Sequence, residues 1–334
     1  MNSKLKWGRS SVLLMIAAVL LLSVLYFSTQ KPQQDAAADQ VLMVGTNVWS
    51  GYEPLYLARS MGQYDPATIQ LVEHSSTSQV IRAFRNGLLQ AAAVTLDEFL
   101  LLRESQLDVS IILVTDISKG ADAIISKPEF NHLKDLKGKR IGVEDTALGA
   151  YFLSRALDIQ GLSPSDFTIV SLSADQMEKA YDDGSVEAVV TFDPVRTKLL
   201  SKGGRQIFDS TSTPGEIVDV LVVHNGYAEQ HPDNIDQLLR GWFAALANME
   251  IDPDGSAEVF SKRLELPVDQ VWGSFDGLLI PGKQGNLKMI QGDIPVLLES
   301  LIKMQKVMID KNLMTEPVDL SRSINPKPML RSSK

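Results

Sequence analysis

The sequence has 334 residues, of which 44% are hydrophobic and 22% charged, so the chain is globular and long enough for two domains with separate cores. Its formal net charge of -9 argues against a nucleic-acid-binding protein, because neutralising phosphates requires clustered Lys and Arg. Cysteine is absent, which excludes disulfides, thiolate metal sites, cysteine nucleophiles and a lipid-modified N-terminal cysteine. The 4 histidines lack the spacing of a metal site, and we expect neither a metal nor a cofactor.

Residues 1–30 predict an export signal that is retained as a membrane helix. Lys4, Lys6 and Arg9 precede an uncharged stretch, residues 10–30, whose centre is almost wholly apolar. This apolar core is longer than the ~7–15 residues of a cleaved signal and approaches the ~17–25 residues that cross a bilayer. Because the basic residues keep their end in the cytoplasm, we expect a periplasmic protein anchored to the inner membrane by an uncleaved N-terminal helix.

Cleavage of this segment is the alternative. The small residues Ala36, Ala37 and Ala38 offer a peptidase site, but they lie well beyond the apolar core. Residues 31–40 are polar and rich in Gln and Ala, which is typical of a flexible tether. In either case the body of the protein is exported.

The body begins with strands that alternate with helices. Strands are predicted at Val41 to Thr46, Ile69 to His74, Gln90 to Leu96 and Val109 to Thr115. Helices are predicted up to Met61, from Gln79 to Arg85 and up to Leu102. Ser50 and Glu53 have the spacing of a capping box, and Pro54 suits the first turn of the helix that follows. This alternation predicts a mostly parallel sheet with helices on both faces.

A second α/β unit begins near residue 135 with a basic turn, a short apolar strand and a capped helix start. Its strands are predicted at Arg140 to Val143, Thr168 to Leu172 and Ala188 to Thr191. Helices between them start near Leu148 and Asp175. A chain that restarts in this way has two lobes, and the space between two α/β lobes is most often a ligand cleft.

The last third becomes helical after a strand at Ile217 to Val223. Helices are predicted at Asn234 to Asn248, Ser256 to Leu264 and Pro295 to Lys311, and we expect them to return to the first lobe. Two crossings, near Ser118 to Lys127 and Ser210 to Asp219, would then form a hinge. The predicted domains are a first lobe of residues 41–120 and 220–315, a second lobe of residues 121–219, and a polar C-terminal tail of residues 316–334.

The exported body resembles the solute-binding proteins of ABC importers in the nitrate, sulfonate, taurine and thiamine-precursor group. The segments that carry the resemblance are 49–54 (Trp-Ser-Gly-Tyr-Glu-Pro), 120–124 (Gly-Ala-Asp-Ala-Ile), 135–139 (Asp-Leu-Lys-Gly-Lys), 184–190 (Gly-Ser-Val-Glu-Ala-Val-Val) and 214–219 (Pro-Gly-Glu-Ile-Val-Asp). Where such proteins often have Glu-Pro after the last strand of the small lobe, this chain has Asp193-Pro194. The resemblance implies the two-lobed α/β fold of a type II periplasmic binding protein, a monomer without enzymatic activity, whose partner is an ABC permease in the inner membrane.

Ligand-binding residues are predicted where strands of the first lobe end. Trp49 and Tyr52, which follow the first strand with Ser50 between them, can stack on a planar or cationic group, at about 0.5–2 kcal/mol for each cation–π contact. Local packing is the alternative for both aromatic residues. The other candidates of this lobe carry oxygen donors or acceptors that could equally cap helices, and they are Ser75, Ser76, Thr77, Thr95 and Asp97.

Thr146, Gly149 and Asp193 are the candidates of the second lobe. Thr146 is the natural N-cap of a helix, which leaves the amides near Gly149 pointing into the cleft toward a polar acceptor. Asp193 is the favoured ligand contact, with capping of the next helix as its alternative. The presumed cleft loops contain acidic residues but no Lys or Arg, and the acids are Glu53, Asp97, Asp116, Glu144, Asp145 and Asp193.

These features predict capture of a small nitrogen-bearing solute, neutral or cationic, because a strong oxyanion would normally draw an arginine. Delivery of the solute to an ABC importer is the leading function. A membrane-held sensor that reports ligand occupancy to a signalling partner is the second possibility. The third is an enzyme on the same fold, such as a pyrimidine synthase or a deaminase, but no nucleophile with an adjacent base is evident.

Overall fold

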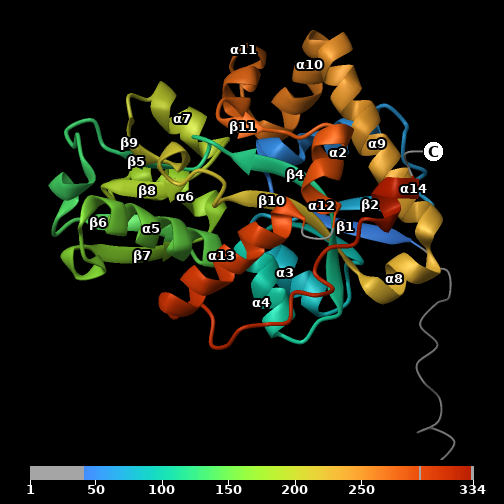
Figure 1. Ribbon diagram of the computed structural model, residues 1–334. Helices are drawn as coiled ribbons and strands as arrows, with labels where there is room; N and C mark the ends of the chain where they lie inside the picture. Colours follow the sequence, from blue (N-terminus) through green and yellow to red (C-terminus); the bar gives the residue numbers. More distant parts are fainter. Residues whose placement is uncertain (1–40, 293–294, 332–334) are drawn as a thin grey trace, which may run out of the picture. The chain divides into compact units, whose positions relative to one another are not determined.

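The computed structural model describes residues 41–292 and 295–331 and builds them around two β-sheets (Figure 1). From edge to edge, the six-stranded sheet consists of β11 (Leu278–Leu279), β4 (Val109–Ser118), β10 (Val218–His224), β3 (Ala91–Thr95), β1 (Leu42–Thr46) and β2 (Ile69–Glu73). The five-stranded sheet consists of β7 (Thr168–Leu172), β6 (Arg140–Glu144), β8 (Ala188–Thr191), β5 (Ala123–Ser126) and β9 (Arg205–Asp209).

Each sheet contains an internal strand, β10 or β5, that is antiparallel to both of its neighbours. β10 is antiparallel to β3 and β4, and β5 is antiparallel to β8 and β9, whereas β1 with β2 and β6 with β7 are parallel pairs. Both reversed strands are entered directly from the other sheet, β5 through residues 119–122 and β10 through residues 210–217. Parallel neighbouring strands are joined by a crossover connection, usually an α-helix, and neither of these two connections contains an α-helix.

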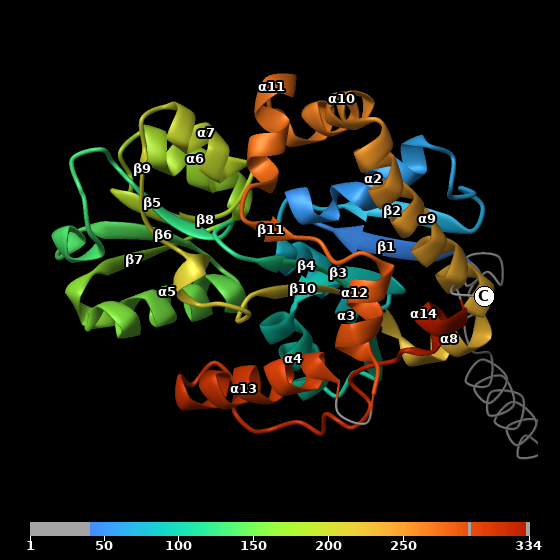
Figure 2. The same cartoon turned by 45° about the horizontal axis from the view of Figure 1, so that its top comes forward.

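Helices cover both faces of the five-stranded sheet (Figure 2). α5 (Ala147–Gln160) packs on one face, and α6 (Ala174–Asp182) and α7 (Val195–Ser201) pack on the other. The strands alternate accordingly, since Ile124 packs in a cluster with Phe152 of α5, whereas its neighbour Ile125 packs with Met177 of α6. Short 3-10 turns, η3 (Leu133–Leu136), η4 (Pro164–Asp166) and η5 (Ser210–Ser212), complete this part.

The six-stranded sheet shares one large core with the remaining helices. These are η2 (Ser50–Tyr52), α2 (Glu53–Ser60), α3 (Thr77–Arg85), α4 (Leu96–Glu104), α8 (Asn225–Gln230), α9 (Pro232–Ile251), α10 (Pro253–Leu264), α11 (Val268–Val271), η6 (Trp272–Phe275), α12 (Lys283–Ile290), α13 (Val296–Asp310) and α14 (Lys327–Arg331). The C-terminal helices therefore return to the sheet that contains the first strand. The sequence had not predicted β5, β9, β11 or the short helices α11, α12 and α14.

Within the predicted polar C-terminal tail, residues 323–331 contact the body of the protein. The Ile111 N–H donates to the Ser323 carbonyl over 2.8 Å, and the Asn325 N–H donates to the Ile111 carbonyl over 2.8 Å. Met329 of α14 is fully buried, and Arg331 binds Asp236 of α9 at 2.9 Å.

The capping box predicted from Ser50 and Glu53 at the start of α2 is wrong. Ser50 lies in η2 and donates to the Ser274 hydroxyl over 3.0 Å, while Glu53 accepts from Arg263 Nε at 3.0 and 3.1 Å. Pro54 does occupy the first turn of the helix, as predicted. Both polar side chains are thus used in tertiary contacts with the last third of the chain.

The predicted membrane helix, residues 1–30, and the tether, residues 31–40, lie outside the described residues. Within residues 41–292 and 295–331, no helix is long and apolar enough to cross a membrane. The predicted lobe boundaries at residues 120 and 220 remain predictions.

Candidate functional site

A small cavity of about 20 Å³ lies where residues of the two sheets meet. The six-stranded part contributes the ends of β1, β3 and β10 and the residues just after them. The five-stranded part contributes the start of β5, the first turn of α5 and the residue after β8. The residues that line this inner cavity are Asn47, Trp49, Tyr52, Thr77, Thr95, Glu98, Asp122, Leu148, Phe192 and Asp219.

A larger cavity of about 370 Å³, the outer cavity, adjoins the inner one. Asn47 and Phe192 line both cavities, so these two side chains form the boundary between them. The outer cavity has apolar walls at Val48, Pro194 and Val195, and charged residues from α6, α7 and α10 surround them. An elongated solute could therefore occupy both cavities at once.

Phe192, at this boundary, packs against the aromatic ring of Trp49. Trp49 and Phe192 meet edge to face, with ring centroids 5.3 Å apart and planes at 85°. The Trp49 indole N–H donates to Asp116 Oδ2 over 3.2 Å, which fixes the ring against β4. Trp49 follows β1 and Phe192 follows β8, which belong to different sheets. Their contact therefore joins the two sides of the cleft.

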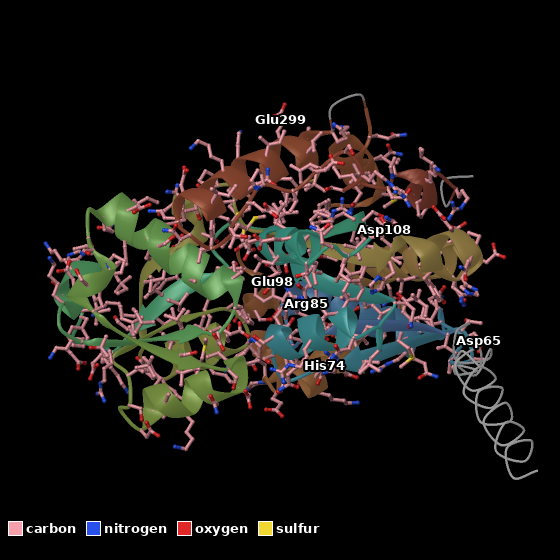
Figure 3. The ribbon with its side chains drawn as sticks, turned by 90° about the horizontal axis from the view of Figure 1, so that it is seen from below. Asp65, His74, Arg85, Glu98, Asp108 and Glu299 are labelled. Atoms are coloured by element: carbon pink, nitrogen blue, oxygen red, sulfur yellow. The ribbon has the colours of Figure 1, made fainter. Side chains whose placement is uncertain are left out.

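Three carboxyl groups line the inner cavity. Burial is the main cause that raises the pKa of Asp122 to about 7. The pKa of Glu98 is raised well above its ordinary value by burial and then by the charge of Asp97, and that of Asp219 by burial and then by the charge of Asp116. Figure 3 shows Glu98 in the interior, whereas Glu299 points outward from α13.

Two oxygens that line the inner cavity have no hydrogen-bond partner among the described residues. They are Asn47 Oδ1 and Asp122 Oδ2, and each of the two residues is only 4% exposed. A buried acceptor without a donor costs about 1–3 kcal/mol. The cavity is therefore equipped to accept hydrogen bonds from a solute that donates them.

Basic side chains lie in the outer cavity, and both are already paired. Lys198 Nζ lies 3.5 Å from Glu265 and 3.8 Å from Glu178. Arg263 binds Glu53 at 3.0 Å and also binds Glu73. The sequence-based expectation that the cleft lacks Lys and Arg was therefore incomplete, because it considered loops, whereas these two residues come from helices α7 and α10.

Six of the predicted ligand-binding residues lie at these cavities. Trp49, Tyr52, Thr77 and Thr95 line the inner cavity, and Ser75 lines the outer one. Gly149 lines a small cavity that shares Asp122, Leu148 and Phe192 with the inner cavity. Their role as ligand contacts remains a proposal.

The other predicted residues have structural contacts. Ser50 binds Ser274, Ser76 is the buried N-cap of α3, and Asp97 is buried in the first turn of α4. Thr146 caps α5 as predicted, accepting from the Gly149 N–H over 3.2 Å. Thr146 itself lines a different cavity, beside Leu153 and Ile169.

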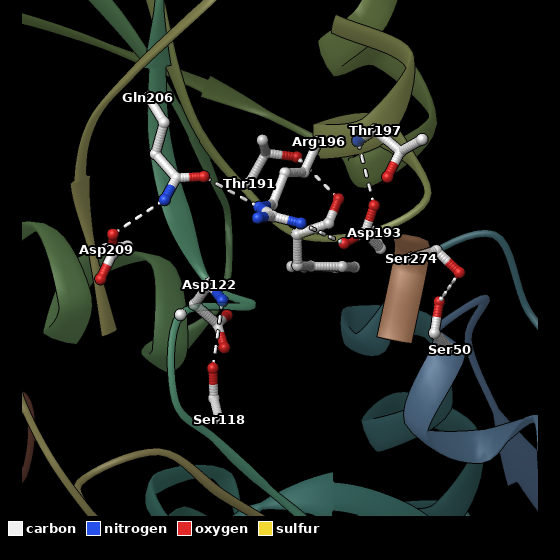
Figure 4. A network of polar contacts seen from close by, with 12 residues as sticks. Ser50, Ser118, Asp122, Thr191, Asp193, Arg196, Thr197, Gln206, Asp209 and Ser274 are labelled. Carbon is white, nitrogen blue, oxygen red and sulfur yellow. Dashed lines mark hydrogen bonds and ion pairs between the residues drawn. The ribbon is translucent and has the colours of Figure 1, made fainter. Parts of the chain in front are cut away.

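Asp193 has the competing role that the sequence allowed (Figure 4). Its carboxylate is fully buried and accepts from the Thr197 N–H at 3.0 Å and from Arg196 Nη1 at 3.1 Å. Arg196 Nε in turn donates to Gln206 Oε1 over 2.9 Å. Both carboxylate oxygens of Asp193 thus accept hydrogen bonds from α7, which follows it, and its role as a ligand contact remains a proposal.

Sequence reasoning missed most of the polar groups of the inner cavity. Asp122 and Asp219 were within the segments that carry the family resemblance, but no local pattern singled them out. Glu98 was not predicted as a cavity residue. It caps α4, because its carboxylate accepts from the Thr95 N–H over 3.0 Å. The remaining missed residues are Asn47, Leu148 and Phe192.

Comparisons with known proteins identify relatives of this chain. A model of the NMT1-like family matches residues 35–263. The taurine-binding periplasmic protein of Escherichia coli strain K12 is 24% identical over 191 residues, which cover 56% of this chain and 59% of that protein. A protein of Bacillus subtilis strain 168, named for binding aliphatic sulfonates, is 22% identical over 312 residues, which cover 90% of each chain.

Solved structures share the two-sheet α/β fold, which confirms the α/β periplasmic-binding-protein fold predicted from the sequence, although the six-stranded sheet is mixed and not mostly parallel. The alkanesulfonate-binding protein SsuA from Xanthomonas axonopodis pv. citri, bound to MOPS, has a TM-score of 0.70 at 19% identity, covering 84% of this chain and 96% of that one. The desulfurization enzyme DSZB has a TM-score of 0.65 at 17% identity, covering 87% and 99%. The fold includes binding proteins and an enzyme, so the residues of the site have to decide the function.

Proposed function

Since this chain belongs to the NMT1-like family, we propose that it is a periplasmic solute-binding protein that captures a small nitrogen-containing solute and delivers it to an ABC importer. Two of its relatives are named as binding proteins. In a protein with two lobes and a hinge, the lobes close around the bound ligand. The membrane partner then meets one closed, ligand-bound conformation. An ABC permease in the inner membrane is the partner that we propose, with the binding protein acting as a monomer.

The observation that carries the choice of solute is the inner cavity with carboxyl groups and no basic side chain among its lining residues. A sulfonate placed there would meet Glu98, Asp122 and Asp219 without a compensating cation. A buried charge without a partner is strongly disfavoured, whereas a protonated amine would relieve the repulsion among the carboxylates. This chain and its sulfonate-binding relatives would then differ in ligand charge.

Contacts across the cleft support a closing mechanism. The Ser78 hydroxyl of α3 donates to the Asp145 carbonyl, before α5, over 2.6 Å. Trp49 and Phe192 add an apolar contact between the same two sides. These contacts would form on closure and enclose the solute, while residues 119–122 and 210–217 act as the hinge.

A thermal-shift screen of the full-length protein in detergent tests the proposal. The panel contains aliphatic amines, aminopyrimidines, taurine and alkanesulfonates. A ligand at ~100 times its dissociation constant stabilises the folded state by about 2.7 kcal/mol, which such a screen detects. Stabilisation by a nitrogen-bearing solute is expected, and the absence of any stabilising solute in the panel would contradict a binding function.

A sensing subunit is the alternative that a membrane anchor favours. The two functions share the cavity and differ in the partner. Uptake of the identified solute by cells with and without the gene separates them, because a transport protein is required for uptake and a sensor is not.

A further inference from the structure

We propose that the solute is an unbranched primary amine whose ammonium group occupies the inner cavity and whose hydrocarbon chain extends into the outer cavity. This inference rests on the proposed binding function and specifies its ligand. Three independent features carry it: the size of the inner cavity, its hydrogen-bond acceptors and the walls of the outer cavity.

Size selects the group that enters the inner cavity. Its volume of about 20 Å³ accommodates one water-sized group. An –NH3+ group is close to a water molecule in size, whereas a trimethylammonium group or an aromatic ring is larger. The size of the cavity therefore favours an ammonium group that is unsubstituted apart from the chain that carries it.

The acceptors of the cavity suit this group in kind. An ammonium group has three N–H donors and no acceptor. Asn47 Oδ1 and Asp122 Oδ2 are buried in the cavity wall and have no donor among the described residues. Glu98 and Asp219 also line the cavity, and a bound cation would favour the charged form of both carboxyls, whose pKa values are raised in its absence.

A metal ion is the other cation that carboxylates attract. Within residues 41–292 and 295–331, no group of at least 3 His, Cys, Asp or Glu side chains is arranged to hold a metal. Organic ammonium ions need no such convergence, because each N–H can reach a separate acceptor.

The outer cavity suits a hydrocarbon chain. It meets the inner cavity at Asn47 and Phe192 and continues along Val48, Pro194 and Val195. Lys198 and Arg263 are each paired with two carboxylates, but Arg263 Nη2 is buried without a hydrogen-bond partner among the described residues. The far end of the hydrocarbon chain can therefore carry one hydrogen-bond acceptor.

Isothermal titration of the full-length protein in detergent with four matched probes tests this ligand class. The probes are n-pentylamine, N,N,N-trimethylpentylammonium, 1-pentanol and pentane-1-sulfonate. We expect n-pentylamine to bind at least about tenfold more tightly than the others, which corresponds to one charge-assisted hydrogen bond. Shortening the amine should weaken binding by about fourfold for each methylene removed, because each buried methylene contributes about 0.8 kcal/mol.

Equal or tighter binding of the trimethyl probe or the sulfonate would overturn the inference while leaving the binding function intact. If n-pentylamine does not bind but another solute of the screening panel does, the inference is also overturned and the binding function still stands. If neither the probes nor any solute of the panel binds, the proposed binding function itself fails.

A pair of variants with the same change of charge locates the ammonium group. Asp122→Asn should weaken n-pentylamine binding at least about tenfold and leave 1-pentanol nearly unaffected. Asp233→Asn removes an exposed carboxylate in the first turn of α9 and should bind n-pentylamine as the wild type does. Unchanged binding by a folded Asp122→Asn protein would overturn the placement.

Discussion

Asp116 on β4 and Asp219 on β10 lie directly opposite each other across an antiparallel strand pair. Both are buried, and the charge of Asp116 adds to burial in raising the pKa of Asp219, because two like charges directly opposite each other would be destabilising. Each is held by an aromatic residue near η2, since Trp49 donates to Asp116 and the Tyr52 hydroxyl donates to Asp219. The sheet therefore carries an electrostatic cost at the inner cavity, and a bound cation would offset it.

The burial of Asp122 predicts the behaviour of Asp122→Asn without ligand. The Asp122 carboxyl has a folded-state pKa of about 7, raised mainly by burial, against about 3.9 in an unfolded chain. The stability that it contributes is complete below about pH 4 and is lost as the pH rises through 7. Asparagine stays neutral, so the variant should be more stable than wild type by about 1–3 kcal/mol at pH 8.

Urea denaturation at pH 8 and pH 5 measures this difference. The advantage of the variant should shrink at pH 5, where the wild-type carboxyl is mostly protonated. A variant that is less stable than wild type at pH 8 would show that Asp122 has a stabilising partner, contrary to its position in the cavity wall.

Asp193→Asn should affect stability and spare ligand binding. The change leaves the guanidinium of Arg196, whose side chain is only 13% exposed, without its carboxylate. Breaking a buried ion pair on one side costs about 3–5 kcal/mol, and the remaining contact of Arg196 with Gln206 should keep the loss near the lower figure. Thermal denaturation and titration with the solute check the two parts, and weakened binding with unchanged stability would restore Asp193 as a ligand contact.

Ligand binding should close the cleft. Because the chain contains no native cysteine, spin labels can be attached only where cysteines are introduced, for example at the exposed Arg82 of α3 and Lys179 of α6. Pulsed electron paramagnetic resonance should show a shorter and narrower distance distribution with saturating solute than without it. An identical distribution in both states would indicate a rigid pocket.

The N-terminal segment should remain on the mature protein. Residues 10–30 are uncharged and largely apolar, and the absence of cysteine leaves no site for a lipid anchor. Mass spectrometry of membrane fractions should find the intact N-terminus. A soluble form that begins near Asp39 would establish cleavage after the alanine run instead.

Local patterns in the sequence were sufficient for the two-sheet α/β architecture. Alternating strands and helices identified most elements, because side-chain periodicity and caps such as Thr146 act over a few residues. The family resemblance, carried by short segments along the exported body, is confirmed by the match over residues 35–263. The unpredicted strands β5 and β9 adjoin residues 119–122 and 210–217, where the chain passes from one sheet to the other and leaves the regular βα alternation.

The chemistry of the site was decided only by the tertiary structure. Asp116 and Asp219 are far apart in the sequence, and only strand pairing makes them neighbours. Asp193, which the sequence favoured, is occupied by Arg196 in the next helical turn, whereas Asp122 gave no local signal and lies in the cavity wall. A carboxylate becomes a cap, an ion-pair partner or a ligand contact according to the donors that distant segments bring to it, and local sequence does not contain that information.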